Sequence, residues 1–293
     1  MKLEKLKTVT KVKRKSMTIR PSGRSSDYIS PSFGHGCLFD CSYCYMKRNK
    51  PDGLSIATNT EDILTEINNH AIFSTVNKPN QTHSEYITYD ISCNEDFALH
   101  SRHHEWKKIF EFFRDHPTAM ATLATKTLPL DFLSFDPKGK VRIRMSLMPQ
   151  DLSTHLEPNT ATIEKRLMFV NDLIEAGYDV HLNFSPVVVF EGWILEYVDL
   201  FEQVNELIYD EYKHKVLSEV IFLTHNKSLH ERNVLQKRQY EDLLWTPEFQ
   251  EEKKSQYGGN NIRYAHEWKP TWIEDFKRIH RNHIPWNTIR YIF

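Results

Sequence analysis

The sequence predicts an α/β fold, a partial (β/α)6 barrel of the TIM type. Three observations predict it. Short apolar or alternating segments, typical of strands, are each followed by a segment with helical periodicity. Six such pairs follow one another, and right-handed connections curl six parallel units into an open barrel. The 293 residues can bury a large core and fit one large domain or two small ones. The predicted strands cover residues 27–32, 86–91, 119–124, 141–146, 180–189 and 219–224.

The strands differ in their patterns. The segment 141–146 alternates between apolar and polar residues, which is typical of a strand with one buried face. The segment 180–189 is almost continuously apolar, as expected of a strand buried on both faces, and we expect Pro186 to interrupt it.

The helices have recognisable ends. Glu61 and Asp62 occupy the first turn of a helix that opens near Thr60, where acidic side chains suit the helix dipole. Gly177 is a typical C-terminal stop for the long helix before it. Only a short helix is expected after the third strand. The other predicted helices cover about 103–114, 160–176, 193–208 and 228–244.

Unusual residues follow the strand ends. A cysteine-rich loop follows the first strand and Cys93 the second, while Lys126 ends the third and Ser146 the fourth. In barrels of parallel strands, chemistry gathers at the carboxyl ends of the strands. The sequence therefore predicts one site built from these loops.

The chain is expected to have three parts. Residues 1–26 form a basic arm, residues 27–246 form the partial barrel, and residues 247–293 form an aromatic and basic extension that closes it. Among residues 1–24 there are nine Lys or Arg and one Glu, although the net charge of the whole chain is −1. Such an arm suits a polyanionic partner or is simply a solvated terminus.

Composition excludes some classes of protein. No apolar segment reaches the roughly 18 residues that a membrane span needs, and the N-terminus has no apolar signal-peptide core. Four cysteines, three of them clustered, argue against a secreted disulfide framework. We expect a cytoplasmic protein that is not bound to a membrane.

The most informative motif is the cysteine loop, with Cys37, Cys41 and Cys44 in the spacing C-x3-C-x2-C. Thiolates are soft ligands that select iron–sulfur clusters, zinc or Cu(I). A [4Fe–4S] cluster ordinarily takes four cysteines, so three leave one iron open to a small molecule. The alternative is a structural zinc site with His35 as fourth ligand, but such sites usually have two separated ligand pairs.

The loop resembles that of the radical S-adenosylmethionine (SAM) enzymes, with Tyr43 as the aromatic residue before the third cysteine. From about residue 30 to the end, the chain resembles the spore photoproduct lyase family in an ordered series of segments. These are GCLFDCSYCYM at 36–46, ISCNED at 91–96, ATK at 124–126, RIRMS at 142–146, EP at 157–158, AGY at 176–178, SP at 185–186, EGW at 191–193 and IRYIF at 289–293.

The resemblance implies a set of cofactors and residue roles. The three loop cysteines would hold a [4Fe–4S] cluster, and SAM would bind the open iron. Lys126 and Ser146 would contact SAM, and Glu95 and Tyr45 would lie beside it. Cys93 matches the family's hydrogen-donor cysteine, and Tyr43 and Tyr45 are candidates for relaying a hydrogen atom.

The resemblance also implies a reaction, the repair of a thymine photoproduct in DNA by a carbon–carbon lyase. A deoxyadenosyl radical takes hydrogen from C6 of the thymine dimer, the methylene bridge breaks, and Cys93 quenches the product radical. DNA and an external electron donor, such as a flavodoxin or ferredoxin, are the implied partners.

Two departures leave other functions open. Glu95 stands where the family has a serine, and the segment before the cluster loop is shorter than in the spore enzyme. A radical SAM enzyme acting on another nucleobase, or on a substrate that is not a nucleic acid, is therefore an alternative. A third hypothesis is a non-enzymatic Fe–S or zinc protein that binds nucleic acid.

Overall fold

The computed structural model describes residues 8–46, 53–75, 77–254 and 260–293. Its largest element is an eight-stranded sheet in the order β14-β10-β9-β8-β7-β6-β3-β2. The strands are β2 (Arg20–Pro21), β3 (Tyr28–Ile29), β6 (Ile87–Asp90), β7 (Ala119–Thr125), β8 (Val141–Leu147), β9 (Asp179–Val187), β10 (Leu217–Phe222) and β14 (Thr288–Ile292).

The sheet confirms the predicted partial barrel. All six predicted strands are present, and their order in the sheet, from β3 to β10, is their order in the chain. The pairs β3–β6, β6–β7 and β7–β8 are parallel, as is the pair β10–β14. Strand β9 runs through Pro186 to Val187, so the expected interruption at this proline is wrong.

The helices are α2 (Thr60–Phe73), α3 (Trp106–Asp115), α4 (Gln150–Leu156), α5 (Ile163–Glu175), α6 (Trp193–Leu207), α7 (Asp210–Lys213), α8 (Lys227–Leu235), α9 (Glu241–Leu244) and α10 (Lys269–His283). Short 3-10 turns cover Ser101–His103, Leu130–Ser134 and Pro247–Phe249. No helix of the described residues is long and apolar enough to cross a membrane.

The chain divides into two compact units. The first comprises Met1–Leu38, Lys50–Met145 and Asp172–His181, and the second comprises Phe39–Asn49, Ser146–Asn171 and Leu182–Phe293. The predicted division at residues 26 and 246 stays a prediction, and Gly258 and Gly259 of the C-terminal part lie outside the described residues.

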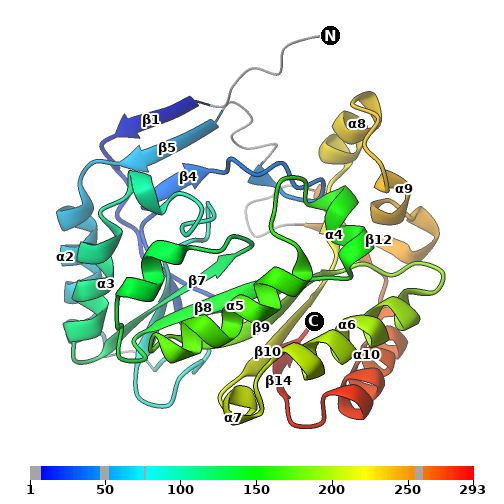
Figure 1. Ribbon diagram of the computed structural model, residues 1–293. Helices are drawn as coiled ribbons and strands as arrows, with labels where there is room; N and C mark the ends of the chain where they lie inside the picture. The colour runs from blue at the N-terminus through cyan, green and yellow to red at the C-terminus, as the bar shows by residue number, and fades with distance from the viewer. Residues whose placement is uncertain (1–7, 47–52, 76, 255–259) are drawn as a thin grey trace. The chain divides into compact units, whose positions relative to one another are not determined.

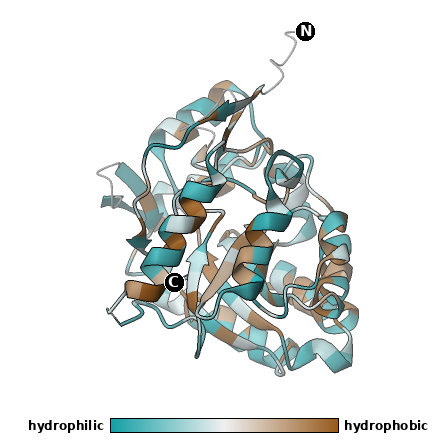
Figure 2. Cartoon of the chain, turned by 90° about the vertical axis from the view of Figure 1, so that its left-hand side faces the viewer, coloured by the Kyte–Doolittle hydropathy of each residue, from teal (hydrophilic) through white to brown (hydrophobic). Residues whose placement is uncertain are grey.

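The first unit has an aromatic core. The buried ring of Phe110 lies 4.8 Å from that of Phe132 and 5.5 Å from that of Trp106. Phe110 and Trp106 are four residues apart on α3, so they share one face of the helix. Helices α2 and α3 lie side by side (Figure 1). Figure 2 shows hydrophobic and hydrophilic residues alternating along these helices, as expected of elements with one buried side.

The first unit also holds a small sheet, β1-β5-β4, with β1 (Thr8–Val12), β5 (Gly53–Ala57) and β4 (Gly34–Gly36). Strands β1 and β5 are parallel, and β4 is antiparallel to β5 (Figure 1). Part of the predicted basic arm is therefore strand, and β4 leads directly into the cysteine loop.

In the second unit, Phe276 of α10 packs against Phe201 and Tyr197 of α6, with ring centroids 5.4 and 5.5 Å apart. Helices α6 and α10 lie side by side (Figure 1). A second small sheet has the order β11-β13-β12, with β11 (Thr224–His225), β13 (Asn260–Tyr264) and β12 (Gln250–Lys254). Strand β14 places the C-terminal part of the chain in the main sheet.

Two predicted helices differ from the structure. The helix predicted at 160–176 begins at Ile163, and α4 precedes it; Gly177, with φ +92°, follows its end as predicted. The helix predicted at 228–244 is two helices, because Lys237 and Tyr240 have φ of 53° and 60°. A residue in the left-handed region ends an α-helix.

Candidate functional site

The cysteine loop follows β4 and carries the three clustered thiols. Cys41 is buried, whereas Cys37 and Cys44 are half-buried. The backbone N–H of Cys44 donates to the carbonyl of Cys41 at 3.2 Å, which closes a turn between these residues. The structure describes all cysteines of the chain, and none forms a disulfide. The loop therefore retains three soft ligands for a metal cluster.

Within the second unit, the middle of the loop is anchored on both sides. The backbone N–H of Ser42 donates to the carbonyl of Leu156, at the end of α4, at 2.8 Å. The carboxylate of Asp40 pairs with the guanidinium of Arg238. Both contacts act on residues between the cysteines, so they constrain the loop without using a thiol.

Tyr43 contacts a buried carboxylate. Its hydroxyl donates to Oε1 of Glu157. Burial raises the pKa of Tyr43 well above the usual value of a phenol, and the charge of Glu157 raises this pKa further. The hydroxyl therefore keeps its hydrogen at neutral pH. Tyr45 is in a different setting, because 44% of this residue is exposed.

A chain of hydrogen bonds leads from Tyr43 to Ser146. The guanidinium of Arg166 donates through Nη1 to Oε2 of Glu157 and to the carbonyl of Ser146, each at 2.9 Å. The hydroxyl of Ser146 accepts from the amide of Asn183 at 3.3 Å. The structure thus connects two predicted site residues through a buried ion pair that was not predicted.

In the first unit, Cys93 lies half-buried in the loop after β6. The backbone carbonyl of the next residue, Asn94, accepts from the N–H of Gly36 at 3.0 Å. The side-chain amide of Asn94 donates to Ser32 Oγ at 2.6 Å. Nη2 of Arg20 lies 3.9 Å from Sγ of Cys93. The loop of Cys93 is therefore joined to β4, the strand that leads into the cysteine loop.

Asp96 joins the same loop to the end of β7. Its Oδ1 accepts from Oγ1 of Thr125 at 2.8 Å, and its Oδ2 accepts from the N–H of Lys126 at 3.0 Å. Ser92 Oγ accepts from the N–H of Ala124 at 3.0 Å. These bonds bring the loop of Cys93 and the backbone of Lys126 together, as the strand-end rule predicts.

A second ion pair, between Arg144 and Asp90, lies at the start of the loop of Cys93. Arg144 of β8 donates to Oδ2 of Asp90 at 2.8 Å and to Oγ1 of Thr122 at 3.0 Å. The other oxygen of Asp90 accepts from the N–H of Ser92 at 2.8 Å. Both charged side chains are buried. A buried pair with these additional hydrogen bonds orders the start of the loop.

Glu95 is directed at two histidines. Its Oε2 lies 3.0 Å from Nδ1 of His100 and 2.9 Å from Nε2 of His104. Burial by itself raises the pKa of this carboxyl, but the two imidazoles outweigh burial and hold the pKa of Glu95 below its usual value. A Cβ added to Gly34 would lie 2.3 Å from the Glu95 carboxylate. The expected contact between Glu95 and SAM stays a prediction.

The predicted site residues occur in both units. Those in the first unit are Cys37, Cys93, Glu95 and Lys126. Those in the second unit are Cys41, Tyr43, Cys44, Tyr45 and Ser146. Within each unit the structure links predicted residues through buried polar side chains, and the roles assigned to the residues themselves stay predictions.

The sequence analysis missed Arg166 and Asp96. Arg166 had a signal, because it lies on the same face of α5 as Ile163 and Val170, and all three are fully buried. An arginine at a buried helical position usually has a carboxylate partner. Asp96 belongs to the ISCNED segment at 91–96, but its residue type gave no signal of its contacts, since an aspartate in a loop is ordinary.

The family model described as spore photoproduct lyase matches residues 2–293. The chain belongs to the spore photoproduct lyase family. A spore photoproduct lyase of Bacillus subtilis (strain 168) is 27% identical over 213 residues, which is 71% of this chain and 59% of that protein. One of Geobacillus sp. (strain Y412MC61) is 25% identical over 197 residues, 65% of this chain and 54% of that protein. The chain thus spans less than two thirds of the length of these relatives.

Solved structures of spore photoproduct lyase have the same fold. One, complexed with dinucleoside spore photoproduct, has a TM-score of 0.85 at 21% identity, over 97% of this chain and 82% of that one. A double mutant with bound AdoMet and dinucleoside spore photoproduct has a TM-score of 0.84 at 20% identity, with the same coverage. This likeness confirms the fold that was predicted, a partial barrel.

Proposed function

We propose that this chain is a radical SAM enzyme, a carbon–carbon lyase that repairs a thymine photoproduct in DNA. One observation carries the proposal. The C-x3-C-x2-C loop is continuous with β4, and the loop of Cys93 is hydrogen-bonded to that strand between Asn94 and Gly36 at 3.0 Å. Membership of the spore photoproduct lyase family supports the same reaction.

The residues present suit the cofactors. Three thiols within eight residues, none in a disulfide, suit a [4Fe–4S] cluster with one iron left for SAM. When bound, this pair of cofactors supplies a reductively formed carbon radical. Cys37, Cys41 and Cys44 would be the ligands. Further contacts to SAM are proposed for Lys126, Ser146, Glu95 and Tyr45.

Cys93 is the proposed hydrogen donor. Its S–H bond breaks, a C–H bond forms on the thymine radical, and a thiyl radical remains on sulfur. We propose that Tyr43 or Tyr45 returns a hydrogen atom to that sulfur. The tyrosyl radical that remains would take a hydrogen atom from 5′-deoxyadenosine, the product of SAM cleavage. Tyr43 suits this role because its hydroxyl is held in the loop by its hydrogen bond to the carboxylate of Glu157. The Arg20 guanidinium beside Sγ provides a cation close to the thiol.

The proposed partners follow from this reaction. The substrate is DNA that carries the photoproduct, and the basic residues between Lys11 and Arg24 suit its phosphates. An external one-electron donor, such as a flavodoxin or ferredoxin, would reduce the cluster. The expected cytoplasmic location stays a prediction.

The experiment is an anaerobic assay on the purified protein. We expect iron and sulfide near four per chain, reductive cleavage of SAM, and release of thymidine from dinucleoside spore photoproduct. A protein with all three loop cysteines changed to alanine is the control and should show none of these. Iron binding and SAM cleavage without thymidine release would contradict repair of this lesion. A protein that binds no cluster would contradict the proposal as a whole.

A second candidate function has one observation in its favour. Glu95, where the family has a serine, is buried and directed at two histidines. This difference near the proposed SAM site favours a radical SAM enzyme that acts on another nucleobase. Transfer of deuterium between SAM and oligonucleotides of different base composition, measured by mass spectrometry, would identify such a substrate.

A further inference from the structure

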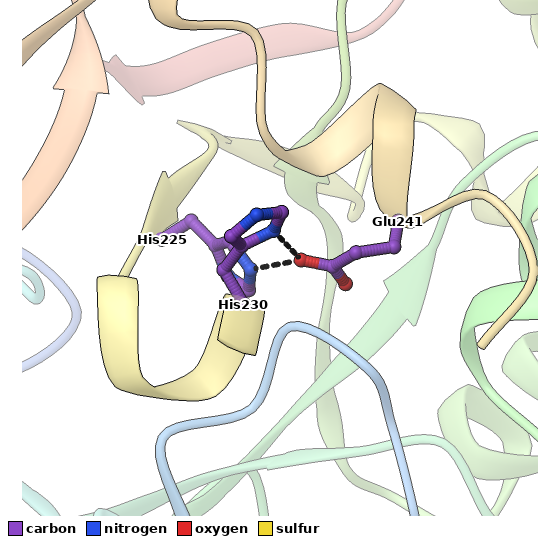
Figure 3. Close-up of side chains that lie close together, drawn as sticks. All are labelled: His225, His230 and Glu241. Atoms are coloured by element: carbon purple, nitrogen blue, oxygen red, sulfur yellow. Dashed lines mark hydrogen bonds and ion pairs between the residues drawn. The ribbon is translucent and has the colours of Figure 1, made fainter. Parts of the chain in front are cut away.

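Two buried glutamates, one in each unit, are each surrounded by two histidines. Glu95 has His100 and His104 as partners. Glu241 has His225 and His230, as Figure 3 shows. Among the described residues, no Lys or Arg forms a salt bridge with either carboxylate. Burying a carboxylate is costly unless donors satisfy it, and Glu95 depends on its two histidines because its Oε1 has no hydrogen-bond partner in the described structure.

The Glu241 network is built from three neighbouring elements. Oε1 accepts from Nε2 of His225, on β11, at 2.9 Å and from Nδ1 of His230, on α8, at 2.8 Å (Figure 3). Oε2 accepts from the amide of Asn233, also on α8, at 2.6 Å. The ring of Trp245 stacks on His230, with centroids 4.4 Å apart. The carboxylate therefore has a donor on each oxygen.

The side chains of His225, His230 and Glu241 also offer a set of ligand atoms that could hold a metal ion. The geometry favours hydrogen bonds instead. Two ligands on one zinc ion at 2.0–2.1 Å stand about 3.3 Å apart, whereas His225 and His230 lie 2.9 and 2.8 Å from Oε1 of Glu241. Nδ1 of His225 is buried with no hydrogen-bond partner in the described structure, whereas a zinc-bound imidazole ordinarily donates its second N–H.

Asn233 connects this network to the cysteine loop. Its amide nitrogen has two hydrogens, one directed at Glu241 and the other at the carbonyl of Ser42 at 2.8 Å. Ser42 lies between Cys41 and Cys44. Glu241 thus fixes the orientation of the amide, and the amide fixes the backbone between two of the clustered cysteines.

The Glu95 network reaches the other end of the same loop. Nε2 of His100 accepts from the backbone N–H of Leu38 at 3.2 Å, so the ring hydrogen lies on Nδ1 and is donated to Glu95 at 3.0 Å. Leu38 directly follows Cys37. A carboxylate again fixes an intermediate side chain, which in turn fixes the loop backbone.

We propose that Glu95 and Glu241 are positioning residues for the cysteine loop. Glu95 acts through His100 on the N–H of Leu38, and Glu241 acts through Asn233 on the carbonyl of Ser42. Both contacts act on the backbone and not on the thiols, so they order the loop before a cluster is inserted. Preorganised ligands bind a metal more tightly, because less conformational entropy is lost on binding. This inference rests on the proposed cluster-binding role of the loop.

The first test changes Asn233 to leucine, which keeps the branching of the side chain at Cγ, is somewhat larger, and removes both donated hydrogens. The matched control is Asn171→Leu, since Asn171 is also buried in the second unit and its side chain bonds to the backbone carbonyl of Leu207 and the backbone N–H of Tyr209. Hydrogen exchange of the loop is measured in the cluster-free protein. Loss of iron to a chelator is measured in the loaded protein.

We expect Asn233→Leu to speed hydrogen exchange in the loop and to raise the rate of iron loss about 10-fold or more. The control should lose comparable thermal stability without either effect. Glu241→Gln keeps the shape of the side chain but removes the charge, and it should reproduce the effect of Asn233→Leu even if the leucine variant folds poorly. Equal behaviour of Asn233→Leu, Glu241→Gln and the control would overturn the proposal.

A second pair of variants tests the contact from Glu95 through His100 to the N–H of Leu38. His100→Leu removes the acceptor of the Leu38 N–H, and His116→Leu is the control, because His116 is also a buried histidine of the first unit and accepts from the backbone N–H groups of Thr118 and Ala119. The electron paramagnetic resonance spectrum of the reduced cluster should change in His100→Leu and stay that of the unmodified protein in the control. An unchanged spectrum with normal iron retention would contradict a positioning role for Glu95.

The results separate this inference from the proposed function. If the unmodified protein takes up no iron, the proposed function is wrong, and hydrogen exchange of the cluster-free loop still tests whether Asn233 and His100 order it. The remaining outcome is that the Glu241 network binds zinc. Stoichiometric zinc in a protein without the three loop cysteines, lost on His225→Ala, would show that the Glu241 network is a metal site and would overturn its assignment as a hydrogen-bonded network.

Discussion

Cys93 is positioned by its neighbours in the chain. Ser92, Asn94 and Asp96 on either side of it bond to the end of β7 and to the segment of β4. The backbone at Cys93 is therefore held from two directions, while its thiol lies half-buried beside Arg20. This is the setting expected of a side chain that must meet a substrate at a fixed place.

Replacing Cys93 by alanine should separate the two halves of the proposed reaction. SAM cleavage should persist, because the cysteines of the loop are unchanged, whereas the thymine radical loses its hydrogen donor. We expect little thymidine and a set of misdirected products, measured by liquid chromatography and mass spectrometry. Cys93→Ser should behave like the alanine variant, since an O–H bond is too strong to give its hydrogen to a carbon radical. Normal product from either variant would show that the donor is another residue.

Gly34 is a second residue whose identity is constrained locally. A Cβ at this position would meet the Glu95 carboxylate at 2.3 Å, and that carboxylate is held by two imidazoles. We expect Gly34→Ala to lower the free energy of unfolding by about 1–3 kcal/mol, as in other overpacked interiors. Denaturant unfolding of the variant and of the unmodified protein measures this difference in the free energy of unfolding. Gly23→Ala is the control, because nothing lies within 4 Å of its added Cβ, and a change of equal size there would contradict the steric reason.

Among the helices, α5 is tied to α4 by a buried arginine. The guanidinium of Arg166 is fully buried and donates to Glu157, Ser153 and Thr160, all at or near the C-terminal end of α4. A buried charge of this kind depends on its partner, because neither ion is solvated by water. The pair therefore fixes the connection between α5, which was predicted, and α4, which was not.

Arg166→Leu should be strongly destabilising because it leaves Glu157 buried without its cation. We expect a loss of about 3–5 kcal/mol in the free energy of unfolding, measured with denaturant. Changing both Arg166 and Glu157 to leucine should recover part of that loss. Arg278→Leu is the control, since its ion pair with Asp275 is on the surface of α10 and is worth about 1 kcal/mol or less. Similar losses in the two arginine variants would contradict the role of burial.

The break between α8 and α9 shows what local patterns leave out. The segment between them contains neither Gly nor Pro, so it reads as one helix. In the structure, Tyr240 adopts φ +60°, and its hydroxyl donates to Asp151 at 2.6 Å while its ring lies 4.3 Å from that of His155. These contacts are with α4, which is about ninety positions away in the chain. Tertiary contacts overrode the helical pattern.

At the scale of the whole molecule, five histidines have pKa values shifted in the same direction. Burial lowers the pKa of several histidines below the usual value: His70, His83, His103, His116 and His280. A folded-state pKa below the unfolded value means that the unfolded chain binds more protons. The contribution to stability is then complete above the unfolded pKa of about 6.5 and is lost as the pH falls toward the folded value.

We therefore expect the free energy of unfolding to decrease as the pH falls from about 7.5 to about 5. His280 is the histidine to test, because it is buried and its Nε2 lies 3.0 Å from Oδ1 of Asn287. In His280→Gln the decrease should be smaller, since glutamine can donate the same hydrogen bond and does not titrate. Chemical denaturation at each pH gives the comparison. A steeper decrease in the variant would show that the sign is wrong.

The fold could be predicted because its information is local. Strands such as β7 and β9 are marked by apolar segments, and α5 is marked by its periodicity and by Gly177 at its end. Alternating strands and helices leave few possible topologies, since parallel strands need right-handed crossovers. The cysteine loop could be predicted for a similar reason, because its ligands lie within eight residues of one another.

The sequence by itself thus determined the family, the partial barrel and the three-cysteine loop. Only the tertiary structure decided what surrounds that loop. Asn233 donates to Ser42 across 191 positions of the chain, and Tyr43 donates to Glu157 across 114. No periodicity or spacing encodes such pairs, because each depends on how separate elements pack. The buried carboxylates that support the loop are therefore visible only once the chain is folded.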